Sequence, residues 1–258
     1  MSGALRFAYL GSGSKGNAAL VAQDETLIML DCGLTLPEVE RRMQAFGATP
    51  RQLTAVVVTH EHADHTSGVT RLADEYALPV WMTRGTHAVW QGRKPAEVRF
   101  IGPHAPFRIG ALTLTPYPVP HDAREPCQYV FSNDGGRRLG VLSDAGRVTP
   151  YMQQTLSGCN GLLLEFNHDT RMLSEGPYTA RLKKRVGGPY GHLSNDQAAA
   201  LLASLDRSAL QRLVIAHISQ VNNTPALARA AAAQALGHDP DWLEVAHQDD
   251  GLAWRELA

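Results

Sequence analysis

A short segment crowded with metal-binding side chains is the most informative feature of this sequence. Residues 59–65 read Thr-His-Glu-His-Ala-Asp-His and directly follow the apolar run 55–58. Neutral imidazole and carboxylate are ligands of zinc and its first-row neighbours, and alternate residues at a strand end can face one ion while the next turn faces another. The alternative is a solvated His-rich loop. Burying or crowding this many titratable groups without an ion would, however, carry an uncompensated desolvation cost. The segment therefore predicts a site for two adjacent metals.

Further candidate ligands stand at the ends of later strand-like runs. His121 follows residues 116–120, Asp144 follows 139–143 and His217 follows 213–216. Functional residues of α/β sheets are usually displayed at the carboxyl ends of strands. Each of the three alone is more typical of a hydrogen-bonded loop residue, but together with the 60–65 segment they complete a ligand set.

The order His-x-His-x-Asp-His, His, Asp, His, each after an apolar run, resembles the metallo-β-lactamase fold family over essentially the whole chain. The resemblance implies an α/β protein, a four-layer αββα sandwich with two divalent metal ions at one edge of its sheets. It shares the ligands between the two ions: His60, His62 and His121 for one, Asp64, His65 and His217 for the other, and Asp144 as the bridge. Zn²⁺ is the first expectation, with Mn²⁺ or Fe as alternatives.

Hydrolysis is the reaction that such a centre predicts. Two ions about 3.5–4 Å apart can activate a water and hold a leaving oxygen, and we expect Asp64 to act in catalysis as well as in metal binding. Asp31, after the run 27–30, stands where the fold commonly places an aspartate that hydrogen-bonds a ligand imidazole. A strand-end Asp that merely begins the turn 31–33 is an equally open interpretation.

Four other segments together resemble one bacterial subgroup, the YycJ/WalJ-like hydrolases. They are the Ser/Gly loop 10–17, the strand end 164–169, Gly-His-Leu-Ser-Asn at 191–195, and residues 216–219 followed by Asn222 and Asn223. The resemblance implies a nuclease with 5′→3′ DNA exonuclease activity. The loop glycines also allow backbone N–H groups to converge on an anion, although such a hairpin is more often only a turn. The residues expected to support the metals or contact substrate here are Ser12, Ser14, Asn17, Asn167 and His168.

His192 is the candidate general acid. A phosphodiester leaving oxygen departs with negative charge, and a positioned imidazolium that protonates it contributes roughly 10²–10⁴-fold in rate. The alternative is that His192 only orders its loop. The densest cationic run, Lys183, Lys184 and Arg185, lies on the path from His168 to His192 with Arg171 and Arg181 nearby. It suits contact with a phosphate backbone, while a solvated helix face is the alternative of equal weight.

Competing functions use the same metals. The phosphoribosyl cyclic phosphodiesterases share the metal motifs but carry a cysteine-containing structural zinc site, which the dispersed Cys32, Cys127 and Cys159 do not supply. A small-molecule cyclic phosphodiesterase or an ester or thioester hydrolase therefore remains the alternative enzyme. A non-enzymatic nucleic-acid-binding scaffold is disfavoured, because an open dinuclear site with a bridging aspartate suits reactivity better than structure.

Composition adds weaker constraints. A net charge of −1 over 258 residues gives no whole-molecule basic field, so a DNA partner needs a local patch. The odd cysteine count and the absence of a leader or membrane-length apolar stretch favour a cytoplasmic protein without a membrane partner. We expect one domain over residues 1–258. Whether the protein forms a homo-oligomer is left open by the sequence.

The elements that must position the site are short strands alternating with single helices. The expected helices are 37–46, 66–76, 150–156, 195–205 and 225–236. The expected strands are 5–10, 18–21, 27–30, 55–59, 80–82, 98–101, 112–119, 128–131, 139–143, 161–166 and 213–216. Clustered strands with single helices favour a layered α/β sandwich over a doubly wound sheet.

Overall fold

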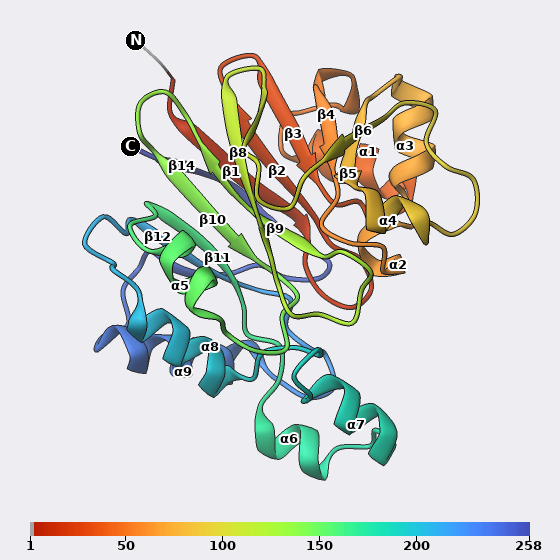
Figure 1. The fold of residues 1–258 in the computed structure, drawn as a ribbon. Helices are drawn as coiled ribbons and strands as arrows, with labels where there is room; N and C mark the ends of the chain where they lie inside the picture. Colours follow the sequence, from red (N-terminus) through yellow and green to blue (C-terminus); the bar gives the residue numbers. More distant parts are fainter. Residues whose placement is uncertain (1–2) are drawn as a thin grey trace. The chain divides into compact units, whose positions relative to one another are not determined.

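The chain divides into two units in the computed structural model, which describes residues 3–258. Unit 1 comprises the chain up to Pro118 together with residues 123–137 and 247–258. Unit 2 comprises residues 119–122 and 138–246. Figure 1 follows the chain through its strands and helices in sequence colours. The expectation of a single domain over residues 1–258 stays a prediction.

Unit 1 contains a seven-stranded mixed sheet with the order β14-β1-β2-β3-β4-β5-β6. Strands β14 to β3 along this order pair antiparallel, and β3 to β6 pair in parallel. Most of the central strands are unbroken buried apolar runs, as expected for strands without a solvated face. The bounds are β1 Leu5–Gly11, β2 Ala18–Gln23, β3 Thr26–Leu30, β4 Ala55–Val57, β5 Val80–Thr83, β6 Val98–Ile101 and β14 Leu252–Leu257.

An antiparallel ladder in the same unit supports the segment that leads into His60. It joins β7 Phe107–Ile109, β8 Leu112–Pro118 and β9 Cys127–Ser132. The Tyr129 hydroxyl donates a 2.8 Å hydrogen bond to the carbonyl of Val58, and the amide of Cys127 donates a 3.0 Å bond to the carbonyl of Thr59. These bonds hold the backbone between β4 and the histidine-rich segment.

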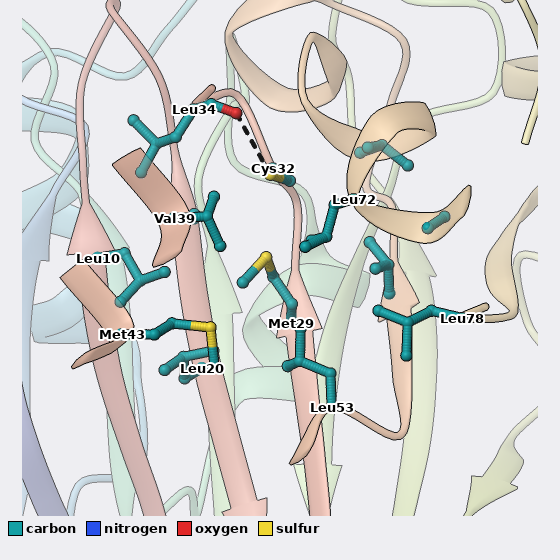
Figure 2. Packing of buried hydrophobic residues seen from close by; sticks show 14 of the residues in the cluster. Leu10, Leu20, Met29, Cys32, Leu34, Val39, Met43, Leu53, Leu72 and Leu78 are labelled. Atoms are coloured by element: carbon teal, nitrogen blue, oxygen red, sulfur yellow. Dashed lines mark hydrogen bonds between the residues drawn. The ribbon is translucent and has the colours of Figure 1, made fainter. Parts of the chain in front are cut away.

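The helices of unit 1 pack a hydrophobic cluster against its sheet. They are α1 Leu36–Ala45, the 3₁₀ turn η1 Pro50–Gln52, α2 Ala63–Thr66, α3 Val69–Tyr76 and α4 Arg84–Ala88. Figure 2 shows Val39 and Met43 of α1 and Leu72 of α3 directed toward Leu20 and Met29 of the strands. All five side chains are wholly buried, so burial of apolar surface fixes α1 and α3 on this sheet.

The helix expected over 66–76 is present from Val69 to Tyr76 as α3, but its expected first turn belongs to the end of a separate short helix, α2. Helix α2 ends at Thr66 and α3 begins at Val69. Gly68 lies between them, and a Cβ atom there would come within 2.0 Å of the Leu34 carbonyl oxygen. The Gly68 amide also donates to the carbonyl of Cys32 at 2.8 Å. The Gly68 amide therefore bonds to Cys32 instead of the carbonyl of Asp64 four residues earlier, which interrupts the helical hydrogen-bond ladder and ties this point to the loop after β3.

Unit 2 is built on four parallel strands in the order β13-β12-β11-β10. Their bounds are β10 Arg138–Leu142, β11 Gly161–Glu165, β12 Arg212–Ala216 and β13 Leu243–Val245. Parallel strands present their carboxyl ends at one edge. The residues that end or follow β10, β11 and β12 at this edge are Asp144, Glu165 and His217.

Five helices complete unit 2, each begun by a side chain that accepts an N–H bond from its first turn. They are α5 Pro150–Leu156, α6 Thr170–Glu175, α7 Ala180–Val186, α8 Asn195–Ser204 and α9 Pro225–Leu236. The capping residues are Thr149, Asp169, Thr179, Ser194 and Thr224. Helices α5 and α9 have the bounds that the sequence predicts, and α8 ends one residue earlier.

Every strand expected from the sequence is present, with ends that shift by up to two residues. Strands β7, β13 and β14 were not expected, because the first two are only three residues long and β14 mixes charged and apolar residues. Across residues 3–258, no helix combines the length and apolar character needed to cross a membrane.

Candidate metal centre

Unit 1 gathers the histidines of the 60–65 segment at the end of β4. The ring centroids of His60 and His62 lie 4.6 Å apart, and those of His60 and His65 lie 4.3 Å apart. His60 and His65 are wholly buried, whereas the Asp64 side chain is 26% exposed. An Asp64 carboxylate oxygen lies 3.6 Å from Nε2 of His65. The segment therefore places the partly exposed carboxylate of Asp64 beside the buried imidazole of His65.

Asp31 holds His65 and the strand end in a single arrangement. Its Oδ2 lies 2.8 Å from Nδ1 of His65, and its two carboxylate oxygens accept bonds from the amide and the hydroxyl of Thr59, both 2.8 Å long. The Thr59 hydroxyl in turn lies 2.9 Å from Nδ1 of His60. A carboxylate at Nδ1 favours the Nδ1–H tautomer, which directs the lone pair of Nε2 away from Asp31.

Asn17 faces two of the candidate ligands. Its side-chain Nδ2 lies 3.1 Å from Nε2 of His65 and 3.4 Å from an Asp64 carboxylate oxygen. Its Oδ1 accepts a 2.8 Å bond from the amide of Gly13, and its own amide donates to the carbonyl of Asp64 at 2.7 Å. Asn17 thus joins the Ser/Gly loop to the histidine-rich segment.

Most backbone N–H groups of the Ser/Gly loop do not form the anion-binding cradle that its glycines would permit, and the alternative of a turn fits them better. The amides of Ser12, Gly13, Lys15 and Gly16 donate to oxygens of His247, Asn17, Gln248 and Gly13, respectively. These donors are therefore used within unit 1 and do not converge on an anion. Ser12 is buried and Ser14 is exposed at the loop surface.

Unit 2 arranges its candidate ligands around Asp144. Oδ2 of Asp144 lies 3.1 Å from Nδ1 of His217, and Oδ1 lies 4.0 Å from Nε2 of His121. The two carboxylate oxygens thus face different histidines, as a bridging ligand requires. Nδ1 of His121 lies 2.9 Å from the Gly191 carbonyl, which leaves Nε2 directed toward Asp144. The left-handed backbone of His217, with φ of 51°, directs its ring from the end of β12.

Glu165, which the sequence suggested only as part of an outer network with Asn167 and His168, binds the candidate acid His192. Oε1 of Glu165 lies 2.7 Å from Nδ1 of His192, and Oε2 accepts bonds from the amides of Leu193 and Ala145. Burial raises the pKa of the Glu165 carboxyl, and the hydrogen bond with His192 opposes that shift. The available signal was an acidic residue at the end of the apolar run 161–164.

His192 also approaches Asp144, since Nδ1 of His192 lies 3.2 Å from Oδ1 of that residue. The His192 side chain is 21% exposed, whereas Glu165 is wholly buried. A solvent-reachable imidazole that is held by a buried carboxylate can exchange a proton with a bound molecule.

Asn167 and His168 support this edge of unit 2 from the loop after β11. Nδ2 of Asn167 donates to the carbonyl of His217 at 3.1 Å, and the carbonyl of His168 accepts from the amide of Asn195. Burial lowers the pKa of His168 to about 4, with a smaller contribution from the nearby His192 charge. His168 is therefore a neutral imidazole at pH 7.

The cationic run lies on α7, where two of its three residues have partners within unit 2. Nζ of Lys183 donates to the Ser174 carbonyl at 2.6 Å, and Nε of Arg185 lies 2.6 Å from Oδ2 of Asp122. Lys184 is exposed. Helix α7 has no buried residue, so it presents a surface of side chains that a polyanion can reach.

The chemistry of these donors fits divalent metal. Asp144, Glu165, His192 and His217 each offer a ligand atom, and these atoms all lie within 4.8 Å of one another. Imidazole nitrogens and carboxylate oxygens at such spacing match the ligands of zinc and related ions. Burying this many titratable groups without a cation would be costly.

Residues 26–218 match the family model described as "Beta-lactamase superfamily domain". The chain is 33% identical over 236 residues to a Bacillus anthracis protein named exodeoxyribonuclease YycJ, covering 90% of this chain and 89% of the relative. It is 28% identical over 237 residues to exodeoxyribonuclease WalJ of Streptococcus pneumoniae, covering 90% and 88%.

The fold is shared with the solved metallo-β-lactamase fold protein YhfI from Bacillus subtilis. The TM-score is 0.75 with 98% of each chain covered, at 15% sequence identity. The expected α/β sandwich is therefore confirmed. A fold of this type with clustered His and carboxylate ligands defines a metal-dependent hydrolase. The chain belongs to the β-lactamase superfamily, in its YycJ/WalJ-like subgroup.

Proposed function

We propose that this protein is a dinuclear-metal-dependent phosphodiesterase that acts on DNA as a 5′→3′ exonuclease. The observation that carries this proposal is the position of His192, which contacts Glu165 and also lies 3.2 Å from Asp144. A candidate proton donor is thereby placed beside a candidate metal ligand. The names of the YycJ and WalJ relatives support the substrate class.

The proposed ligand set divides between two ions. His60, His62 and His121 would hold one ion, Asp64, His65 and His217 would hold the other, and Asp144 would be shared by both. The two oxygens of Asp144 face His121 and His217, which are assigned to different ions, and this supports the bridging role. Asp64 keeps its proposed catalytic role because its carboxylate is partly exposed and lies 3.6 Å from Nε2 of His65.

Divalent ions bound there would supply the Lewis acidity that activates water and neutralises phosphate charge. Mixed imidazole and carboxylate ligands favour Zn²⁺ and also accept Mn²⁺ or Fe. Asp31 orients His65 through Nδ1, and Asn17 contacts both His65 and Asp64, so both residues would fix the ligand geometry.

His192 protonates the departing sugar oxygen in this proposal. Its Nδ1–H donates to Glu165, which leaves Nε2 as the atom that carries the transferred proton. The buried carboxylate stabilises the imidazolium before transfer and holds the ring in place during transfer. Asn167 and His168 act by holding the loops that carry His217 and α8, and Ser12 and Ser14 remain proposed substrate or support residues at the Ser/Gly loop.

A reducing, cytoplasmic location is proposed from the cysteines. Cys32, Cys127 and Cys159 are buried free thiols. Burial raises the pKa of Cys32 and Cys127 to about 12 and that of Cys159 to about 11, so the unreactive thiol form is favoured in all three.

Side-by-side hydrolysis assays test the proposed function. Metal-free protein is reloaded with Zn²⁺ or Mn²⁺ and given single- and double-stranded DNA labelled at either end, bis-p-nitrophenyl phosphate, a ribose cyclic phosphate and a thioester. We expect early release of the 5′ label as short product, with loss of activity in EDTA. Efficient turnover of the cyclic phosphate or thioester, with intact DNA, would overturn the proposal and favour the alternative hydrolases.

A further inference from the structure

A cleft beside the histidine-rich segment shares His62 with the proposed metal site, but its other lining residues have no part in the proposed chemistry. It lies wholly within unit 1 and has a volume of about 710 Å³. Its lining residues are Glu61 and His62, residues of α2 and α3, and Trp90, Gln91 and Arg93 from the segment after α4. Its volume lies in the range of roughly 300–1,000 Å³ that is typical of small-molecule sites.

Trp90 is a fixed aromatic wall of this cleft. The side chain is partly buried and packs against the hydrophobic cluster of unit 1, while it also lines the cleft. Its amide donates to the carbonyl of His87, and the preceding helix α4 is capped by Thr83. An indole anchored on one side and open on the other can stack on a planar ligand without a large loss of rotamer freedom.

The polar groups of the cleft favour a neutral ligand over a phosphate. Arg93 pairs with Asp74, which also accepts a 3.1 Å bond from the amide of Ala96. The Glu61 carboxylate accepts a 2.6 Å bond from the amide of Arg124. Arg71 and Glu75 add one exposed charge of each sign. The charges nearly balance, so the cleft offers hydrogen-bonding groups and one aromatic face without a cationic focus.

We propose that this cleft is a nucleobase subsite, in which the base of a nucleotide next to the scissile phosphate stacks on Trp90. The inference rests on the proposed function, because His62, which lines the cleft, is a proposed metal ligand. A nucleobase combines a planar aromatic face with neutral donors and acceptors, which are the features that the lining residues match. Stacking is tolerant of sequence, so the subsite recognises single-stranded nucleic acid generally.

The test combines a Trp90→Leu variant with an abasic scan. Leucine keeps apolar contact with the core but removes the aromatic face, and Trp90→Phe restores one. Binding is measured in EDTA with a ten-nucleotide single strand, and with strands that carry one abasic unit at each of the three terminal positions at either end. Phe100→Ala, an aromatic that is 41% exposed and does not line the cleft, is the matched control.

We expect one abasic position to weaken binding to the wild type by about 5- to 150-fold. Trp90→Leu should weaken binding of the intact strand by a similar factor and lose the positional effect, while Trp90→Phe and Phe100→Ala should retain that effect. The proposal is overturned if the positional effect survives in Trp90→Leu, or if no position matters in the wild type. Because binding is measured without metal or turnover, failure of the hydrolytic function is read separately, from an uncut strand in the reloaded wild type.

Discussion

Nδ1 of His192 lies 2.7 Å from Oε1 of Glu165, and the Glu165 carboxylate is wholly buried. Two backbone amides occupy the other oxygen of Glu165, so this carboxylate has one fixed orientation. His192 itself is partly exposed. The pair therefore couples a rigid acceptor to an imidazole that a substrate can reach, which is the arrangement that general acid catalysis requires.

Removing the acid should separate proton transfer from metal binding. We expect His192→Ala to retain the metals and to lose roughly 10²–10⁴-fold in DNA turnover. A nitrophenolate leaving group needs no proton, so hydrolysis of bis-p-nitrophenyl phosphate should fall much less. Glu165→Gln should lower DNA turnover by roughly 10–100-fold, with little further effect when His192 is already absent.

Elemental analysis of these variants supplies the control. Glu165 and His192 lie in one cluster with Asp144 and His217 that could hold a metal ion. Loss of metal from His192→Ala, or equal slowing of both substrates, would identify His192 as a ligand or loop anchor.

Asp31→Asn should weaken metal binding while keeping the fold. Asp31 has a left-handed backbone with φ of 57°, a conformation that asparagine tolerates well. The neutral amide no longer favours the Nδ1–H tautomer of His65, so we expect metal affinity to fall roughly 10–100-fold. Asp24→Asn is the matched control, since Asp24 has φ of 51° and contacts Gly3. Equal metal affinity in both variants, measured by competition with a chelator, would remove Asp31 from the metal site.

The cations of α7 should contribute unequally to DNA binding. Replacing Lys183, Lys184 and Arg185 together by Ala should weaken DNA binding and flatten its salt dependence, without affecting a small aryl phosphodiester. For Lys184→Ala alone, the logarithm of the binding constant for single-stranded DNA should fall less steeply with the logarithm of salt concentration. The slope should be smaller by about 0.7 per lost phosphate contact. Lys183→Ala should instead lower thermal stability, because Lys183 holds the carbonyl of Ser174. Unchanged salt dependence in the triple variant would make α7 a structural helix only.

His168 should make folding stability depend on pH below neutrality. Its pKa is lowered to about 4 in the folded protein, from an ordinary value of 6.5. The unfolded chain therefore binds the proton more readily, so stability is complete above pH 6.5 and falls as the pH drops toward 4. Between pH 7 and 5, wild type should lose about 1–2 kcal/mol relative to His168→Gln in urea unfolding of the metal-free protein. A constant difference between the two proteins would contradict this account.

The sequence predicted the parts of this site that lie close together along the chain. His60, His62, Asp64 and His65 fall within one segment after an apolar strand, and Asp144 and His217 follow apolar strands of their own. Glu165 and His192 are 27 residues apart, and only the packing of β11 against the loop before α8 brings them together. The use of the Ser/Gly loop amides inside unit 1 also depends on a distant partner, Gln248. Local pattern does not report such long-range contacts.

The break at Gly68 has the same origin. Thr66 to Tyr76 has the local pattern of one helix, but the Gly68 amide donates to the distant carbonyl of Cys32 and not to the preceding helical turn. The cleft next to α3 likewise arises from the positions of α2, α3 and the segment after α4 in space.

Metal content and DNA hydrolysis measured together in Asp144→Ala test the central claim most directly. Asp144 is the one residue proposed to bind both ions, and its two oxygens face His121 and His217. Asp144→Asn tests the same carboxylate with less change in volume, and Asp196→Ala, an exposed residue of α8, is the control. We predict two metal ions per chain in the wild type and in Asp196→Ala, at least one ion fewer in both Asp144 variants, and almost no hydrolysis by them. Two bound ions with retained turnover in Asp144→Ala would contradict the dinuclear hydrolase.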